Sequence, residues 1–301
     1  MVHVVVLNWH KRGATLDCVA ALRRMTTAAW SLVLVDNGCQ DFNQAEVERL
    51  APGGVYLHSP TNLGFAGGAN LGMREALARG AEWVWFLNND ALPEGGALEA
   101  LLAVARATPP AAIVGAKVLL RQAPDRLDSV GLDVDLALGR MRLIGHDEVD
   151  HGQYDRLSDP LAVSGCALLA SAAVLRDLDG FDERFFSYLE DADLCLRARQ
   201  LGWRVAFAPR ARVLHDRAPA RRGRQDPSSL YYSVRNHLLL LQRHGAGAPW
   251  QRKWQEAAVA ARAAAFSLLS GSAPLARLRA TRRGVADYRR CVVGPDPEQQ
   301  R

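Results

Sequence analysis

Five short apolar segments constrain the fold of this chain more than any other feature of its sequence. The first is almost continuously apolar and runs from His3 to Trp9. Such runs are typical of strands that are buried on both faces of a parallel sheet. Because helical patterns alternate with these strands, the sequence predicts right-handed crossovers and a doubly wound α/β sheet. The other four segments are 32–35, 55–57, 82–87 and 111–119.

Helical and turn-like patterns lie between these strands. Apolar spacing predicts a helix over 15–28, and Pro93 is expected to open another helix at a position that proline tolerates. The glycine-rich segment 62–70 is expected to be a turn that leads into a helix ending near Arg79. A dinucleotide-binding fingerprint should follow the first strand, whereas these glycines follow the third. This position argues against an NAD-dependent dehydrogenase.

The pattern becomes less regular after residue 120. Residues 121–160 are expected to form an excursion such as a hairpin, and 163–169 a further buried strand. From Ser229 onward the chain is mostly helical, and the helices are separated by glycine and proline. We expect two short strands at 203–208 and 211–215, followed by helices at 231–242, 250–269 and 275–291.

Charge is distributed unevenly along the chain, although its net charge is only +5. Residues 1–209 hold 19 basic and 26 acidic side chains, whereas residues 210–301 hold 18 and 6. A basic tail on an acidic body suggests contact with an anionic membrane surface, and a solvated helical face is the alternative. No nucleic-acid-reading motif accompanies the tail. The apolar run 257–269 is interrupted by Arg262 and is too short to span a bilayer.

The cysteines and the first strand indicate where the protein resides. Five cysteines are scattered without a CxxC pair, which argues against a disulfide framework or a structural zinc site. The first strand begins at residue 2, so we expect no signal peptide. Together these features predict a cytoplasmic protein, with peripheral contact at the inner face of the membrane through its tail.

Polar residues close three of the predicted strands, at Asn8, Asp36 and 88–90. Ligands of doubly wound sheets bind beyond the carboxyl ends of the strands. Asp90 suits Mg²⁺, which prefers carboxylate oxygen, and Asn88 could contact a ribose. His215 closes a later strand and could add an imidazole, a ligand that suits Mn²⁺ better than Mg²⁺. The alternative for His215 is a buried, hydrogen-bonded side chain.

Three carboxylates, Glu190, Asp191 and Asp193, precede a helical pattern. A carboxylate that a rigid element holds in place can take a proton from an alcohol. The structural alternative is a capping box between Ser187 and Glu190, with acidic residues favoured by the helix dipole. In that interpretation Asp193 and Arg197 form an ordinary exposed pair at i,i+4.

In this order the motifs resemble those of family 2 inverting glycosyltransferases of the GT-A fold, and most closely the rhamnosyltransferase-like bacterial branch. The resemblance implies a doubly wound mixed sheet and a catalytic domain at 1–217, with a nucleotide-sugar half at 1–120 and an acceptor half at 121–217. A linker at 218–228 and a basic helical extension at 229–301 would follow. The motifs are Val4–Trp9, Val35–Asn37, Asn62–Asn70, Leu87–Asp90, Gly180–Glu183, Tyr188–Arg197 and Val213–His215.

The resemblance implies transfer of a sugar such as rhamnose from a dTDP- or UDP-linked donor to a glycan or lipid-linked acceptor hydroxyl, with inversion. Asp191 would be the general base, and Glu190 would orient the acceptor or the base. Asp90 and His215 would bind the divalent cation, Mg²⁺ or Mn²⁺. The residues implied to bind the nucleotide sugar are Asn8, Asp36, Asn62, Gly64, Asn70, Asn88 and Asn89.

Two positions depart from the family pattern. Asn88 stands where the family motif DxD begins, so one negative charge is missing. Many members carry an arginine shortly after the glycine-rich segment, where this chain has Gly68 and Ala69. Either another cation, such as Arg74 or a tail arginine, would hold the diphosphate, or the metal would carry more of the charge.

Other functions remain open at this point. A sugar-1-phosphate nucleotidyltransferase would need a basic phosphate loop after the first strand, and 8–13 is a poor version of one. A non-catalytic glycan-binding protein would not need both Asp90 and Asp191. A membrane-docking module would depend on the tail arginines Arg277, Arg279, Arg282 and Arg283. The tail helices and 121–160 are candidates for a lid, and the same helices could pack on a second chain.

Overall fold

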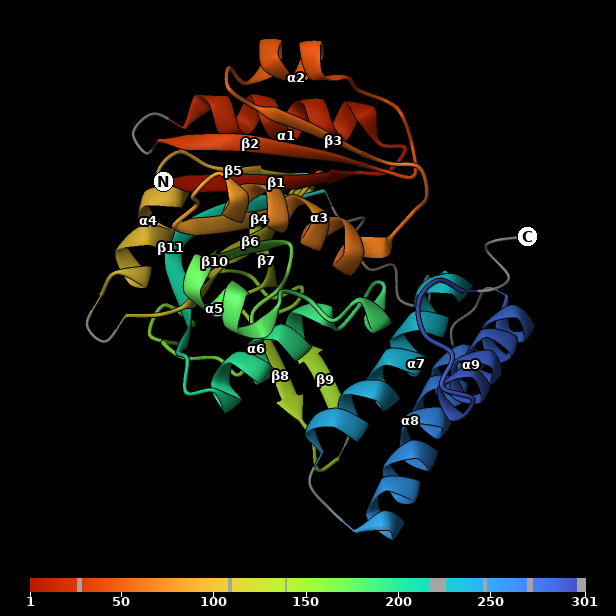
Figure 1. Ribbon diagram of the computed structural model, residues 1–301. Helices are drawn as coiled ribbons and strands as arrows, with labels where there is room; N and C mark the ends of the chain where they lie inside the picture. The colour runs from red at the N-terminus through yellow and green to blue at the C-terminus, as the bar shows by residue number, and fades with distance from the viewer. Residues whose placement is uncertain are drawn as a thin grey trace.

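The computed structural model shows an α/β body with three further helices at one side (Figure 1). It describes residues 1–25, 29–107, 110–138, 140–216, 226–245, 248–269 and 273–296. Most of the predicted linker at 218–228 lies outside these ranges. Its last two residues belong to the first C-terminal helix, which begins at Pro227.

One mixed sheet forms the centre of the body, in the order β3-β2-β1-β4-β10-β6-β11-β5 with β7 beside β6. Its strands are β1 Val2–Asn8, β2 Trp30–Asn37, β3 Val55–Ser59, β4 Trp83–Asn88, β5 Ala91–Pro93, β6 Ile113–Leu120, β7 Ala123–Ser129, β10 Ala167–Ser171 and β11 Val205–His215. Strands β3, β2, β1 and β4 are parallel. Because β10 runs antiparallel to both β4 and β6, the second half is mixed. The predicted mixed α/β sheet is confirmed.

Helices cover both faces of this sheet. They are α1 Arg12–Arg24, α2 Gln44–Leu50, α3 Gly64–Ala78, α4 Ala97–Ala105, α5 Ala172–Leu178 and α6 Glu190–Gln200. In β1, Val4 belongs to the core with Leu22 of α1, whereas Val5 belongs to the opposite core with Met73 of α3. Since neighbouring side chains of a strand point to opposite faces, both faces of β1 must be apolar. This burial explains the uninterrupted apolar runs.

Residues 121–160 contain two antiparallel pairings. Strand β7 folds back on β6, and β8 (Leu132–Asp135) pairs with β9 (Arg140–Leu143) in a separate two-stranded sheet. The predicted excursion is therefore two hairpin-like pairings. Strand β11 replaces the two expected short strands, because the chain passes through a register shift between Ala208 and Arg212 without leaving the sheet.

Two predicted helix starts are wrong. Pro93 does not open a helix, because it ends the edge strand β5 and α4 begins only at Ala97. Proline is tolerated there because an edge strand needs fewer backbone donors. The glycine-rich segment is not a turn, because α3 begins at Gly64 and includes most of it. A Cβ on Gly72 would overlap Val5, so glycine lets this helix approach the sheet closely.

The three helices at the C-terminal side are α7 (Pro227–His244), α8 (Pro249–Leu269) and α9 (Pro274–Arg289). They confirm the predicted helical extension. They share a small core, in which Val234 and Leu238 of α7 lie with Val259 and Ala263 of α8. No helix in the described part of the chain is long and apolar enough to cross a bilayer.

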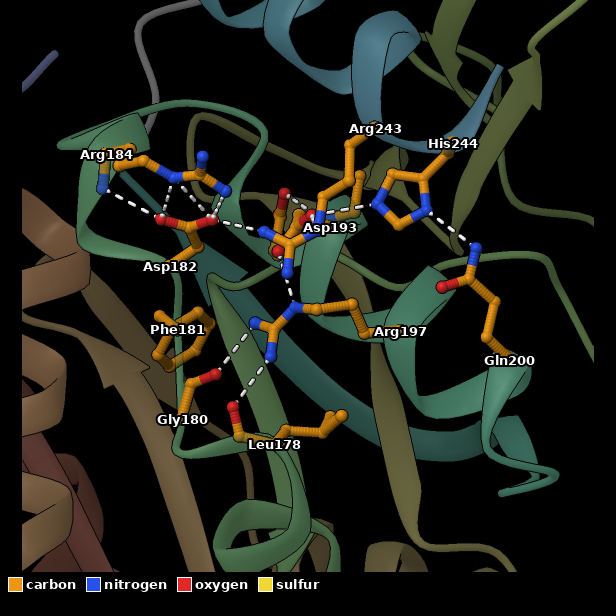
Figure 2. A network of polar contacts seen from close by, with 12 residues as sticks. Leu178, Gly180, Phe181, Asp182, Arg184, Asp193, Arg197, Gln200, Arg243 and His244 are labelled. Atoms are coloured by element: carbon orange, nitrogen blue, oxygen red, sulfur yellow. Dashed lines mark hydrogen bonds and ion pairs between the residues drawn. The ribbon is translucent and has the colours of Figure 1, made fainter. Parts of the chain in front are cut away.

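Buried ion pairs join α6 to the end of α7 (Figure 2). Asp193 is fully buried, and its carboxylate accepts a hydrogen bond from Arg197 Nε at 2.7 Å. His244 Nε2 lies 2.8 Å and Arg243 Nε 3.4 Å from the same carboxylate. Arg243 also contacts Asp182. The pair Asp193–Arg197 is therefore part of the packing between body and extension, not an exposed pair at i,i+4.

Replacing Gly72 with alanine should destabilise the protein by about 1–3 kcal/mol, because the added methyl group meets the branched side chain of Val5. The matched control is Gly13→Ala in α1, where a Cβ meets nothing within 4 Å. Alanine there should be neutral or stabilise by up to about 1 kcal/mol. Urea denaturation of both variants measures the effect. Equal stabilities would contradict the close packing of α3 on β1.

Candidate active site

Two adjoining cavities open at the carboxyl edge of β4. One is about 610 Å³ and the other about 480 Å³. Both are bordered by Phe65, Asn88, Ser187 and Tyr188, so they form one continuous depression. The larger, which we call the strand-end cavity, is also lined by Trp9, Lys11, Asn37, Asn62, Gly64, Asn89, Asp90, Ser229 and Tyr232. The smaller, the carboxylate cavity, is also lined by Asp128, Met141, Leu143, Gly165, Cys166, Glu190, Asp191 and His215.

Asp90 and His215 face each other where the two cavities meet. His215 Nε2 lies 3.3 Å from one carboxylate oxygen of Asp90, and Lys11 Nζ lies 3.0 Å from the other. The residues come together because β11 pairs antiparallel with β5, which brings His215 opposite Ala91. The structure thus joins the two residues that the sequence analysis assigned to a metal, although they are 125 positions apart in the chain.

Asp128 of β7 holds the other side of the His215 ring. Its Oδ2 lies 2.8 Å from His215 Nδ1, and the Asp128 side chain is only 4% exposed. This arrangement directs Nε2 towards Asp90. A carboxylate behind a histidine fixes the tautomer and orientation of the ring, as in many metal sites.

The charges at this corner shift both ionisable groups. Burial by itself would raise the pKa of Asp90, but His215 and Lys11 outweigh it and lower the pKa to about 2. Burial would lower the pKa of His215, but the Cys166 side chain and the two carboxylates raise it to about 12. Asp90 is therefore an anion at neutral pH and can bind a cation.

Glu190 and Asp191 open α6 beside the carboxylate cavity. Asp191 accepts hydrogen bonds from Gly165 N at 2.7 Å and from its neighbour Ala192 N at 2.8 Å, which fix its orientation. Burial raises the pKa of Asp191, and these backbone bonds oppose the rise. Burial, reinforced by the Asp191 charge, raises the pKa of Glu190 well above its usual value. Among the described residues, Glu190 Oε2 has no hydrogen-bond partner.

The segment before α6, residues 186–189, adopts an unusual backbone. Phe186, Tyr188 and Leu189 all have φ between 63° and 72°. Phe186 is the centre of a tight turn in which Ser187 N donates to Phe185 O at 2.7 Å. Left-handed conformations cost a residue with a side chain about 1–3 kcal/mol each. The structural alternative of a capping box between Ser187 and Glu190 is wrong, because the N-cap of α6 is Leu189.

Asn236 of α7 holds this strained segment. Its side-chain amide donates to the carbonyl oxygens of Phe185, Ser187 and Tyr188 at 2.7–2.8 Å, and the residue is fully buried. Arg235 reinforces the contact through a 3.0 Å bond to Phe185 O. Sequence reasoning missed both residues, because they lie in a helix that no recognised motif covered.

Asn8 and Asp36, predicted to bind the nucleotide, do not border the strand-end cavity. Both are fully buried, and Asn8 Nδ2 donates to Asp36 Oδ1 at 2.7 Å. Asp36 also accepts from Phe42 N at 2.9 Å and Tyr56 OH at 3.0 Å. These bonds occupy both carboxylate oxygens, so here the pair supports the loops after β1 and β2. Asn37, the next residue along β2, does line the cavity.

Asn70 also lies away from the strand-end cavity. Its side chain is buried in α3 and bonds to both the N–H and the carbonyl of Phe181. Asn62, Gly64, Asn88 and Asn89 do line the cavity. The structure thus brings together four of the seven predicted nucleotide-sugar residues.

Lys11 provides a positive charge that sequence reasoning did not assign. Among the described residues that line the strand-end cavity, it is the only cationic one. Arg74, named as a substitute for the missing arginine, lies 3.7 Å from Glu183 and borders a separate cavity of about 280 Å³. The signal for Lys11 was its place directly after the first strand.

The fold is that of GT-A glycosyltransferases. A mannosyltransferase from Pyrobaculum calidifontis, solved with GDP-Man and Mn²⁺, superposes with a TM-score of 0.58 over 97% of this chain and 82% of its own, at 17% identity. S. aureus TarS 1–349, solved with UDP-GlcNAc, gives 0.57 over 97% and 83%, at 14% identity. At these identities the likeness establishes the fold.

Sequence comparison identifies the family. The sequence model of "Glycosyltransferase like family 2" matches residues 1–238, so the chain belongs to glycosyltransferase family 2. The match extends beyond residue 217 and includes Asn236. An N-acetylglucosaminyl-diphospho-decaprenol L-rhamnosyltransferase of Mycobacterium tuberculosis is 29% identical over 75% of this chain and 79% of its own length. A pre-mycofactocin glycosyltransferase of the same species is 28% identical over 65% and 40%.

Asn236→Ala should destabilise the protein by about 1–3 kcal/mol, because the carbonyls of Phe185, Ser187 and Tyr188 lose a buried hydrogen-bond donor. Gln242→Ala, an exposed position on the same helix, is the matched control and should change stability by less than about 0.5 kcal/mol. Thermal and urea denaturation give both values. If the two variants lose equal stability, Asn236 does not hold the segment.

Proposed function

We propose that this protein transfers a sugar from a nucleotide-diphosphate donor to an acceptor hydroxyl, with inversion at the anomeric carbon. The observation that carries the proposal is the junction of the two adjoining cavities, where the Asp90–His215 corner suits a cation and the Glu190–Asp191 carboxylate pair lies beside it. The strand-end cavity would hold the nucleotide diphosphate. The carboxylate cavity would hold the acceptor.

The residues of the strand-end cavity suit a divalent cation with a diphosphate. Asp90 is an anion, His215 would bind the cation through Nε2 once the cation displaces the proton on that nitrogen, and Asp128 supports the ring from behind. This oxygen and nitrogen donor set suits Mn²⁺ or Mg²⁺, with diphosphate oxygens completing the shell. Two related folds were solved with Mn²⁺. When bound, the cation would neutralise charge that develops on the leaving diphosphate.

Lys11 would assist in the same place. Its ammonium group lies 3.0 Å from Asp90 and its side chain is 58% exposed, so it can turn towards a donor phosphate. It supplies one positive charge where Asn88 removes one negative charge relative to the family motif. Lys11 and Asn88 both make the site less negative than two aspartates without a lysine would, which favours the diphosphate.

Asp191 would act as the general base. Bonds from two backbone amides hold its carboxylate at the first turn of α6, and its raised pKa makes it a better proton acceptor than a solvated aspartate. It would take the proton of the acceptor hydroxyl as the oxygen attacks the anomeric carbon. The donor C–O bond breaks on the opposite face, and one displacement inverts the configuration. Glu190 would position the acceptor.

We further propose rhamnose as the sugar and a lipid-diphosphate-linked glycan as the acceptor class. The name of the rhamnosyltransferase relative supports both, since it specifies L-rhamnosyl transfer and a diphospho-decaprenol carrier. The carboxylate cavity is compatible with a sugar, because it combines Tyr188, which is 45% exposed, with carboxylate and hydroxyl groups. Aromatic faces and carboxylates are suited to the apolar and hydroxyl sides of a sugar ring.

Asp191→Asn should reduce turnover at least about 100-fold, because general base catalysis typically contributes that much or more. The assay follows nucleotide release from a panel of sugar nucleotides, with dTDP-rhamnose first. Asp125→Asn is the control, since Asp125 is exposed on β7 and borders neither cavity. Because the base must be ionised, activity should fall as pH drops below the raised pKa of Asp191. Full activity in Asp191→Asn would refute its role.

Asp128→Asn should weaken Mn²⁺ binding about 10–100-fold, because an amide no longer fixes the His215 ring. Asp90→Asn should have a larger effect, since it removes the anionic ligand. Calorimetric titration with Mn²⁺ and nucleotide diphosphate measures both without requiring turnover. EDTA should abolish the release of nucleotide from the sugar-nucleotide donor in the wild type. Unchanged Mn²⁺ affinity in both variants would place the metal elsewhere.

A further inference from the structure

The outer face of α8 is apolar along its whole length. Trp250 is 69% exposed, Trp254 52% and Leu268 65%. Residues three or four positions apart in a helix lie on one side of it. This surface, which we call the α8 stripe, consists of Trp250, Trp254, Ala257, Ala261, Ala265 and Leu268, all of them exposed.

The opposite face of α8 already has its partners. Val259 and Ala263 pack with α7, Gln255 donates to Leu136 O at 2.8 Å, and Ser267 is fully buried. The α8 stripe therefore points away from the rest of the molecule. In Figure 1, α8 lies on the far side of α7 from the sheet. Exposed apolar surfaces of this extent mark interaction sites in soluble proteins.

Further apolar side chains extend the stripe at its C-terminal end. Leu269 is 86% and Leu275 70% exposed, on either side of the connection between α8 and α9. Tryptophans at one end and leucines at the other give the stripe large side chains over about 27 Å, from the helical rise between Trp250 and Leu268. Such a length is suited to a flat surface more than to a small pocket.

The charges around the stripe indicate what covers it. Residues 226–296 carry 11 basic and 4 acidic side chains. Arg252 and Lys253 are exposed between the two tryptophans in sequence, and Arg279 and Arg282 are exposed on α9. By contrast, Arg277 is buried, and Arg283 pairs with Asp296 at 3.1 Å. The exposed charge therefore lies partly on α8 itself, and not only on the arginines of α9.

We propose that the α8 stripe docks on an anionic lipid bilayer, with α8 in the interface plane. Tryptophan is enriched at membrane interfaces, and interfacial helices combine an apolar face with lysine and arginine beside it. A second copy of this chain would bring the same exposed positive charges against each other, which disfavours it as the occupant. The proposal concerns surface chemistry alone, so it does not depend on the transferase activity.

The test is flotation of the full chain with vesicles of phosphatidylcholine containing roughly one-third phosphatidylglycerol, and with phosphatidylcholine alone. The wild type should float with the anionic vesicles, and less at high salt. The combined variant Trp250→Ser, Trp254→Ser, Leu268→Ser should lose roughly tenfold or more of its vesicle binding. The control variant Leu161→Ser, Leu201→Ser removes exposed apolar residues of the body and should float as the wild type does.

Two results would overturn the proposal. One is a wild type that does not float, or a stripe variant that floats equally well. The other is a wild-type dimer in light scattering without vesicles that becomes monomeric in the stripe variant, which would assign the stripe to a second copy. Circular dichroism melting shows that each variant is folded, and nucleotide release measured without vesicles tests the transferase separately.

Discussion

The hydrogen bonds from Asn236 to segment 186–189 are the constraint on which the rest of the site depends. The segment has left-handed backbone at three residues that are not glycine, a conformation that persists only where surrounding contacts impose it. Asn236 supplies three of these contacts from α7. On the other side, a Cβ on Gly64 would collide with Phe186. The segment is therefore clamped between the start of α3 and the middle of α7.

This clamp explains why the first C-terminal helix belongs to the catalytic unit. Segment 186–189 borders both cavities and leads directly into the carboxylate pair of α6. A second set of contacts, around Asp193, joins α6 to the end of the same helix (Figure 2). The boundary predicted at 217 lies between β11 and α7. The hydrogen bonds of Asn236 cross it, and the family match extends to residue 238.

Sequence patterns predicted the sheet well because strands that are buried on both faces must be apolar at nearly every position. They located Asp90, His215, Glu190 and Asp191 because strand ends and an acidic cluster mark them. They could not show that Asp36 accepts hydrogen bonds from Phe42 N and Tyr56 OH, because the path of the chain after β2 brings those donors to it. They also missed Asp128 and Asn236. Their roles depend on neighbours that are far away in the sequence. Asp128 contacts His215, 87 positions later, and Asn236 contacts residues at least 48 positions earlier.

The burial of Glu190, whose Oε2 has no hydrogen-bond partner among the described residues, has a thermodynamic consequence. Its pKa in the folded protein lies well above 4.5, because burial and the Asp191 charge both disfavour the anion. Its contribution to stability is therefore complete below the ordinary pKa of about 4.5 and is lost as pH rises through the folded-state value. At any given pH, Glu190 therefore keeps its proton in a larger fraction of molecules than a solvated glutamate does. An acceptor hydroxyl that bonds to Glu190 Oε2 would change the pKa of this carboxyl. Binding of the acceptor would therefore be coupled to proton exchange with solvent.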